Sequence, residues 1–205
     1  SHLVRLVVYL PLAMPPAVGG LALTALLGRR GLLGPVLEQA GLHVSFAFPG
    51  VVAAHLFVTL PFVVVAVDSA LRQLDPEVVA SARGIGLSTG TILRRIILPA
   101  ILPAVFTGGA LAFARSLGEF GTTITFAGSL PGSTRTMPSG IYLEREVSAD
   151  NAYALSAVLI GIAILTLTAA GMPLLLRRRR EQAVRALQPM DTAALRTMTS
   201  PQVSP

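Results

Sequence analysis

Four long stretches of the chain contain almost no charged side chains and are rich in Leu, Ala, Val and Ile. They predict membrane-spanning helices over residues 6–28, 45–67, 96–117 and 152–176, because crossing the hydrocarbon core takes roughly 20 mostly apolar residues in a helix. A soluble protein would have to bury all four helices, and too little polar chain remains to cover them. The pattern therefore predicts an all-α fold, a polytopic membrane helix bundle.

The composition supports the membrane prediction. Of the 205 residues, 53% are hydrophobic and only 13% are charged, and the mean hydropathy is +0.70. A soluble domain carries about 25% charged residues, and a disordered chain needs low hydrophobicity, so both classes are excluded. The chain has no cysteine, which excludes disulfides and thiolate metal sites within it.

The 16 basic residues, all of them Arg, are unevenly placed along the chain. Four spans put both visible termini on the same side. If that side is the cytoplasm, eleven Arg lie inside, Arg115 lies at a span end, and four lie outside: Arg29, Arg30, Arg135 and Arg145. The positive-inside rule therefore predicts a multi-pass protein of the plasma membrane with both visible termini in the cytoplasm. The net charge of +6 then reflects topology, and no nucleic-acid partner is expected.

Proline residues interrupt two of the predicted spans. Pro11, Pro15 and Pro16 lie in the first span, and Pro49 and Pro61 lie in the second. Each proline removes a backbone N–H donor and can kink or break a helix. Broken helices at membrane depth are tolerated where they are buried in protein or line a water-filled path. Such breaks fit a transport pathway, whereas for any single proline irregular packing is the favoured interpretation.

The segment between the second and third spans, residues 68–95, is too polar to cross a membrane. Asp75 before Pro76 predicts the start of a short helix over residues 76–83, which two glycines then end. Ser88 can cap a second short helix that leads into the third span. The segment therefore has the form of a docking element at the cytoplasmic face, and a solvated connector is an equally weighted alternative.

One run in this segment resembles a motif of a known family. Ala80-Ser81-Ala82, three residues, Gly86, nine residues and Ile96-Ile97-Leu98-Pro99 match the spacing of the "EAA" motif of binding-protein-dependent ABC importer permeases, which reads Glu-Ala-Ala, three residues, Gly, nine residues and Ile-x-Leu-Pro. The resemblance implies that residues 68–95, here called the coupling segment, dock on a separate cytoplasmic ABC ATPase subunit. The implied ATPase-coupling residues are Ala80, Ser81, Ala82, Gly86, Ile96, Leu98 and Pro99.

The motif departs from the family at two positions. Ala80 stands where the family has Glu, and Ser81 stands where the family has its first Ala. Glu77 lies three residues too early to be that Glu. The departure removes the carboxylate for a salt bridge at this position, but docking through small side chains and Gly86 does not depend on it.

A second stretch, residues 113–142, narrows the resemblance. Gly118-Glu119-Phe120-Gly121 and the residues that follow it are similar to the oxyanion branch of this permease family, and most similar to molybdate permeases. Sulfate/thiosulfate and tungstate permeases share the same four residues. The resemblance covers about residues 3–176 and implies ATP-driven import of molybdate by alternating access, with sulfate/thiosulfate or tungstate as alternatives.

The resemblance also implies an architecture and partners. We expect a permease transmembrane domain over residues 3–176, a type I ABC importer permease core of which four of the usual six spans are visible. Residues 177–205 are expected to form a basic, disordered cytoplasmic tail. The implied partners are ATPase subunits, an extracytoplasmic oxyanion-binding protein, a second permease copy in a homodimer, and the lipid bilayer.

Candidate pathway or gate residues gather at the outer end of the third span. Arg115 and Glu119 lie four apart, so their side chains can pair on one helix face. A pair that only fixes the helix end is favoured over a gate. The hydroxyls of Thr122, Thr123 and Thr125 are donors that a tetrahedral oxyanion can use, and small residues that ease helix packing are an equal alternative.

Nothing in the sequence predicts catalysis. The chain has no Lys and hence no nucleotide-binding P-loop, so ATP hydrolysis is expected in a separate subunit. No cofactor or metal is expected, since none of the three His has metal-ligand spacing to another. His55 lies within a span, where a hydrogen-bonded core residue is favoured over a proton or ligand site. An ion-coupled secondary transporter is the alternative from another class, but it predicts paired acids and internal repeats.

Overall fold

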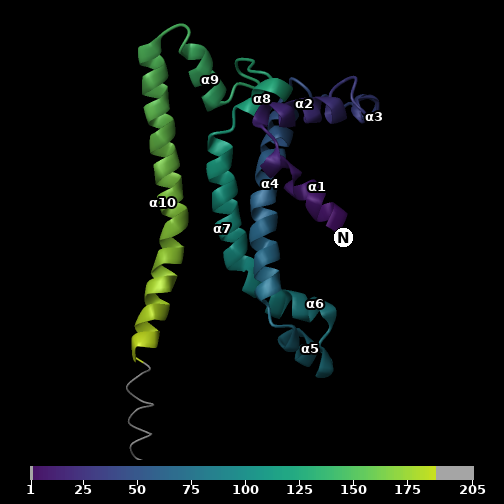
Figure 1. The fold of residues 1–205 in the computed structure, drawn as a ribbon, viewed down its shortest axis with the longest axis vertical. Coiled ribbons are helices and arrows are strands. Elements are labelled where there is room, and N and C mark those ends of the chain that lie inside the picture. Colours follow the sequence, from purple (N-terminus) through teal and green to yellow (C-terminus); the bar gives the residue numbers. More distant parts are fainter. Residues whose placement is uncertain (1, 188–205) are drawn as a thin grey trace, which may run out of the picture. The chain divides into compact units, whose positions relative to one another are not determined.

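The computed structural model describes the backbone of residues 2–187 and the side chains of residues 5–168. Every regular element in this part of the chain is helical, as predicted (Figure 1). Contacts divide the chain into two units, residues 1–166 and 167–205. The elements are α1 His2–Ala13, α2 Pro16–Leu27, α3 Gly34–Gln39, α4 Phe48–Gln73, α5 Pro76–Gly84, α6 Thr89–Ile92, η1 Leu93–Ile97, α7 Leu98–Leu117, α8 Gly121–Phe126, α9 Met137–Glu144 and α10 Ala149–Leu187.

Three helical stretches in the described part are long and apolar enough to cross a membrane. They are Phe48–Arg72, Thr89–Leu117 and Ala149–Thr168, which correspond to the second, third and fourth predicted spans. The third is longer than predicted, because α6, the π-helical turn η1 and α7 follow one another without a break. The second short helix of the coupling segment is therefore the first part of a spanning helix and does not stand alone.

The first predicted span, residues 6–28, is not a single helix. It forms α1 and α2, each of 12 residues, and neither is long enough to cross alone. The break falls at Pro15, which is extended with φ −56° and ψ 139°. Pro16 accounts for it, because a proline disfavours the helical conformation in the residue before it and lacks an N–H donor, and the adjacent Pro15 lacks one as well. Counting apolar residues could not reveal this break.

The other prolines do not interrupt their helices. Pro11 lies inside α1 and Pro61 inside α4, and both helices continue past them. Pro49 occupies the first turn of α4, where its missing N–H would have no helical partner in any case. The interruption expected from the prolines is therefore found at Pro15 and Pro16, and the helices are unbroken at the other three prolines.

Helices α4 and α7 pack side by side along most of their length (Figure 1). A glycine allows their close approach, because a Cβ atom on Gly108 would lie 2.9 Å from the Cβ of Ala66 and 3.0 Å from the Cα of Val63. Small residues at such contacts are typical of membrane helices, whose association depends on close van der Waals packing.

A second contact lies at the end of α4 opposite α5. Here α8 packs on both α2 and α4 (Figure 1). A Cβ atom on Gly20 would lie only 2.6 Å from the Cβ of Thr125, so glycine is needed in α2. The buried side chains of Leu23, Ala54 and Phe126 form the small core of this contact, one from each helix.

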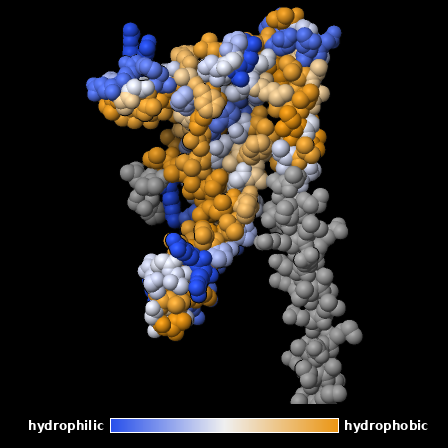
Figure 2. Space-filling view, turned by 180° about the vertical axis from the view of Figure 1, so that it is seen from behind, coloured by the Kyte–Doolittle hydropathy of each residue, from blue (hydrophilic) through white to orange (hydrophobic). Residues whose placement is uncertain are grey.

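Most of the surface of α4 and α7 is hydrophobic. Leu56, Leu60 and Phe106 are between 50% and 67% exposed. In Figure 2, hydrophobic surface covers the middle of these helices, and hydrophilic side chains gather toward both ends, near α5–α6 and at the opposite end. Such surface requires lipid or other protein around it.

The tail differs from its prediction over its first residues. Helix α10 continues to Leu187, so residues 177–187 are helical where disorder was predicted. The reason is local: this stretch contains neither Gly nor Pro and is rich in the strong helix formers Arg, Leu, Ala, Glu and Gln. The rest of the predicted tail, residues 188–205, lies outside the described residues.

Candidate functional site

The coupling segment contains the two helix starts that its sequence predicts. The carboxylate of Asp75 accepts a hydrogen bond of 2.9 Å from the backbone N–H of Glu77, which caps α5. The hydroxyl of Ser88 accepts a bond of 3.3 Å from the backbone N–H of Thr91, which caps α6. Between the helices, Gly86 has φ +82°, a left-handed conformation that favours glycine. These local signals fix a helix–turn–helix at the end of α4.

The motif residues are divided between surface and interior. Ala82 is buried, and so is Ile92 of α6, where α5 and α6 contact each other. Ile96 lies half-buried in the π-helical turn. The remaining motif residues are exposed: Ala80, Ser81, Gly86, Leu98 and Pro99.

Large apolar side chains lie close in sequence to the exposed motif residues of α5 and of the turn after it. Val78, Ile85 and Leu87 are 46%, 79% and 38% exposed. Exposed apolar side chains next to small residues can accept the close approach of another protein. Docking at this place, its partner and the part that each residue plays stay predictions.

The polar cluster, defined as Arg115, Glu119, Thr122, Thr123 and Thr125, lies where α7 meets α8. Glu119 is fully buried in the short link between the two helices. Its Oε1 accepts a hydrogen bond of 2.7 Å from the backbone N–H of Thr122, and its Oε2 lies 2.7 Å from Nη2 of Arg115. One carboxylate thus caps the start of α8 and pairs with the end of α7, and a helix N-terminus favours a negative charge.

The three threonines are mostly occupied within the fold. Thr122 donates its hydroxyl hydrogen bond to the carbonyl oxygen of Pro16 at 3.0 Å, and Thr125 donates to that of Gly121 at 2.8 Å. Thr122 and Thr123 are fully buried. The Thr123 hydroxyl has no hydrogen-bond partner among the described residues. This arrangement favours packing over substrate contact for Thr122 and Thr125.

Two residues outside the predicted set form a polar link between spans. Nδ1 of His55 in α4 lies 2.7 Å from Oγ of Ser116 in α7, and both side chains are half-buried. The hydrogen-bonded interpretation favoured for His55 is therefore found. Ser116 was missed as its partner, because two sequence positions 61 residues apart give no sign that they meet.

A second ionic cluster lies at the other end of α4. Asp68 uses both carboxylate oxygens, with Oδ1 2.9 Å from Nη2 of Arg5 and Oδ2 2.9 Å from Nε of Arg72. It ties α1 to α4 just before the coupling segment begins its first helix. Sequence alone placed Asp68 only at a span end.

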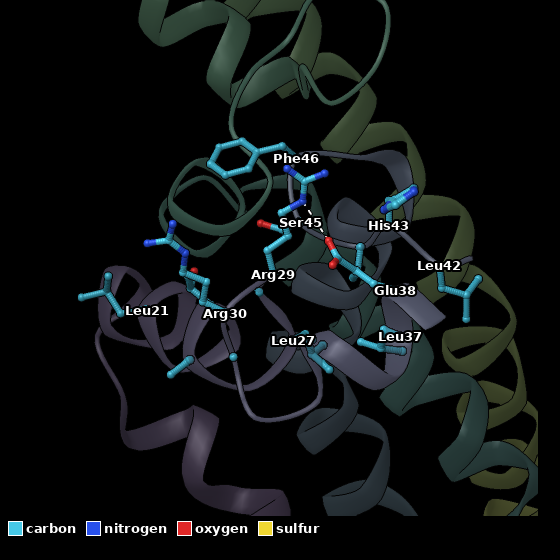
Figure 3. Close-up of a pocket in the computed structure, with 16 residues that line it drawn as sticks. Leu21, Leu27, Arg29, Arg30, Leu37, Glu38, Leu42, His43, Ser45 and Phe46 are labelled. Carbon is cyan, nitrogen blue, oxygen red and sulfur yellow. Dashed lines mark hydrogen bonds and ion pairs between the residues drawn. The ribbon is translucent and has the colours of Figure 1, made fainter. Parts of the chain in front are cut away.

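A pocket of about 750 Å³ lies between the end of α2, α3 and the chain that precedes α4 (Figure 3). Its charged residues include Arg29 and Glu38, which form an ion pair of 2.9 Å. The pairing neutralises Arg29, and Arg30 is a second cation that lines the pocket. Among the described residues, no group of three or more His, Asp or Glu is placed to hold a metal ion.

Comparison with known proteins gives consistent matches. Residues 1–181 match the model of a family described as binding-protein-dependent transport system inner membrane component. The chain is 46% identical over 167 residues to the molybdenum transport system permease protein ModB of Mycobacterium tuberculosis, covering 82% of this chain and 63% of the relative. The ModB protein of Escherichia coli K12 is 38% identical over 180 residues, covering 87% of this chain and 79% of the relative.

A protein named for another anion also matches. The sulfate transport system permease protein CysT of Salmonella typhimurium is 35% identical over 159 residues, or 77% of this chain and 57% of the relative. The chain thus spans less than two thirds of the length of the mycobacterial relative and more than three quarters of that of the E. coli relative.

Proposed function

Because the chain belongs to the binding-protein-dependent transport system inner membrane component family, we propose that it is the membrane-spanning subunit of an ATP-driven importer for molybdate. The choice of molybdate as the substrate is supported by the similarity to the two ModB proteins, which are 46% and 38% identical over more than four fifths of this chain. The sulfate permease is 35% identical over a smaller share. The multi-pass membrane character follows from the three apolar helices and the family.

The energy for transport comes from separate ATPase subunits that dock on the coupling segment. The chain has no Lys, so it contains no P-loop of its own. The exposed small residues Ala80, Ser81 and Gly86, surrounded by apolar side chains, support docking. This subunit is then a conduit, and the chemistry of hydrolysis takes place in its partner.

The remaining partners follow from orientation and surface. The coupling segment faces the cytoplasm, and an extracytoplasmic oxyanion-binding protein delivers the anion at the opposite end of α4. A second copy of the permease completes the pore. The extensive hydrophobic exposure of α4 and α7 supports this, since lipid and a partner copy can both cover such surface.

The continuous helix from Thr89 to Leu117 supplies a mechanical link for alternating access. Its 29 residues extend about 43 Å at 1.5 Å per residue. It begins in the coupling segment and ends where Arg115 and Glu119 connect it to α8. Closure of the ATPase subunits would push its inner end, and the buried ion pair would carry the displacement to α8 and α2.

The proposal is tested by anion uptake into vesicles that contain the full-length permease with its ATPase subunits and loaded binding protein. We expect ATP-dependent molybdate accumulation, read by elemental analysis, which sulfate at micromolar concentration does not suppress. A control with a hydrolysis-deficient ATPase subunit should accumulate none. Preferential uptake of sulfate would replace molybdate with sulfate as the substrate, as the match to CysT would allow.

An ion-coupled carrier is not favoured by the geometry. Such a carrier needs an acid that binds and releases its coupling ion. Glu119 is the buried carboxylate found among the described residues, and both its oxygens are engaged by Arg115 and by the backbone of Thr122. Purification of the permease without any ATPase subunit, together with uptake driven by an ion gradient alone, would support the carrier.

A further inference from the structure

A groove of about 400 Å³ lies between α4 and α7 toward their outer ends. His55 is seven residues into α4, about 10 Å from the start of that helix. His55, Thr59, Gly109 and Ser116 line the groove, and its remaining lining is apolar. No carboxylate is among its lining residues.

The hydrogen bond between His55 and Ser116 leaves one hydrogen-bond donor of the pair unused. If Nδ1 of His55 donates to Ser116, the serine O–H is free to donate elsewhere. If the serine donates to Nδ1, the neutral imidazole carries its proton on Nε2, and that N–H is free. No other hydrogen bond from either side chain is found among the described residues, so the pair presents one donor in either tautomer.

A second hollow between the same two helices provides a contrast. It lies at the coupling end and contains Ser69, Gln73 and Thr107. Here Thr107 donates to the carbonyl oxygen of Pro103 at 2.9 Å, and Gln73 donates to the carbonyl oxygen and to the hydroxyl of Ser69 at 3.2 and 3.3 Å. The outer groove differs from this hollow in that an ionisable side chain, His55, lines it.

An ionisable side chain at membrane depth almost always faces the interior of an assembly or a water-filled cavity, because lipid cannot hydrogen-bond it. His55 is half-buried on the groove side of α4. The groove therefore faces the inside of the assembled transporter. A site with few donors and no carboxylate suits an anion that must enter and leave quickly.

We propose that this groove is a transient binding site for a tetrahedral oxyanion, which accepts hydrogen bonds from the His55–Ser116 pair on entering from the outer side. The proposal rests on the proposed function and names residues that contact the anion. Thr122 and Thr125 of α8 do not take this part, since their hydroxyls donate within the fold.

Thiol labelling tests whether the anion occupies the groove, because the chain has no cysteine. Gly109→Cys places a reporter in the groove without disturbing His55 or Ser116, since a Cβ atom there meets nothing within 4 Å. Ala104→Cys, in the hollow at the coupling end, is the matched control on the same helix. Both full-length variants are labelled in membrane vesicles with a small anionic methanethiosulfonate, with and without molybdate.

We expect molybdate to slow labelling of Gly109→Cys several-fold and to leave Ala104→Cys unchanged. Adding Ser116→Ala to Gly109→Cys should remove the protection, and His55→Gln in its place should retain much of it, because the amide also donates. Equal labelling with and without molybdate would overturn the proposal. A Gly109→Cys thiol that does not react would also overturn the proposal, because it would mean that water does not enter the groove. A disulfide between two copies would overturn it as well, because it would mean that a second permease fills the groove.

Transport separates this proposal from the proposed function. Uptake by Ser116→Ala should fall about tenfold at limiting anion, the effect of losing one hydrogen bond to a charged group. If the unaltered protein moves no oxyanion, the proposed function fails. If it moves molybdate and Gly109→Cys is not protected, only the groove proposal fails.

Discussion

The coupling segment and the polar cluster are built in opposite ways. In the coupling segment, the capping hydrogen bonds of Asp75 and Ser88 reach only two and three residues along the chain. In the polar cluster, Thr122 is bonded to the carbonyl oxygen of Pro16, 106 residues away. The first region is formed by neighbours in sequence and is mostly exposed, whereas the second combines local bonds with a bond to a distant helix and is mostly buried.

This difference in exposure and bonding favours different roles for the two regions. An exposed, locally folded segment can change partners or position without unfolding the rest of the protein. A buried ion pair tolerates no such freedom, because separating Arg115 from Glu119 leaves an uncompensated charge inside the protein. The coupling segment is thus suited to receive a displacement, and the polar cluster is suited to transmit it rigidly.

The comparison is tested most strongly by Glu119→Ala. The change removes the partner of Arg115 and the cap of α8 together, which should lower the stability of the α7–α8 contact by about 3 kcal/mol, the lower end of the range for breaking a buried ion pair. The lower end of this range applies because the Arg115 side chain is 32% exposed and retains contact with solvent. The melting temperature of the detergent-purified protein measures the loss.

Glu119→Gln sharpens the same test. The amide oxygen can still accept from the backbone of Thr122, but the charge that Arg115 pairs with is gone. We expect an intermediate loss of stability and impaired uptake at near-normal insertion into the membrane. Glu146→Gln is the control, because Glu146 also pairs with an Arg, at 2.9 Å, but is 67% exposed and should change little. Unchanged uptake in Glu119→Gln would rule out a part for this pair in transport.

Substitution of two glycines of the coupling segment should give the next largest effect on stability. An added Cβ atom meets nothing within 4 Å at Gly84 or Gly86, so the positions differ in backbone conformation and not in space. Only Gly86 has positive φ, at +82°. Gly86→Ala should therefore cost about 1 kcal/mol locally, whereas Gly84→Ala, at the end of α5, should be neutral or slightly stabilising.

Hydrogen exchange of the α5 amides measures this pair of variants. Faster exchange is expected for Gly86→Ala and equal or slower exchange for Gly84→Ala, with unchanged protection in α8 for both. ATP-dependent uptake should fall in Gly86→Ala, because the turn directs α5 toward its partner. Faster exchange in α8 would contradict the separation of the two regions drawn above.

The same contrast explains what could be predicted from the sequence. The caps at Asp75 and Ser88 and the turn at Gly86 depend on neighbouring residues, so the sequence indicates them directly. The spans at 45–67, 96–117 and 152–176 were also visible, since each is one long apolar run. The apolar run over 6–28 forms two short helices, and the break is indicated by the adjacent prolines Pro15 and Pro16, whereas hydropathy alone averages over it.

Long-range partners could not be predicted from composition. Thr122 provides a hydroxyl donor in any arrangement, and only the fold shows that the carbonyl oxygen of Pro16, 106 residues away, accepts its hydrogen bond. The link between His55 and Ser116 was missed for the same reason. The pairing of Arg115 with Glu119 could be predicted because the residues are four apart, although Glu119 lies just beyond the end of α7.

The smallest effect on stability is expected from Ala80→Glu, which restores the acid that the motif of the family carries. Ala80 is exposed on α5, one turn after Glu77 and one turn before Arg83. The new carboxylate would be repelled by Glu77 and attracted by Arg83, each by about 0.2–0.5 kcal/mol. These terms have opposite sign, so the melting temperature should not change. Any change in ATP-driven uptake, or in the ATPase subunit retained during purification, would then report contact with the partner. A melting temperature that fell as far as in Glu119→Ala would mean that position 80 packs inside the protein, and the contrast between an exposed docking segment and a buried transmitting cluster would fail.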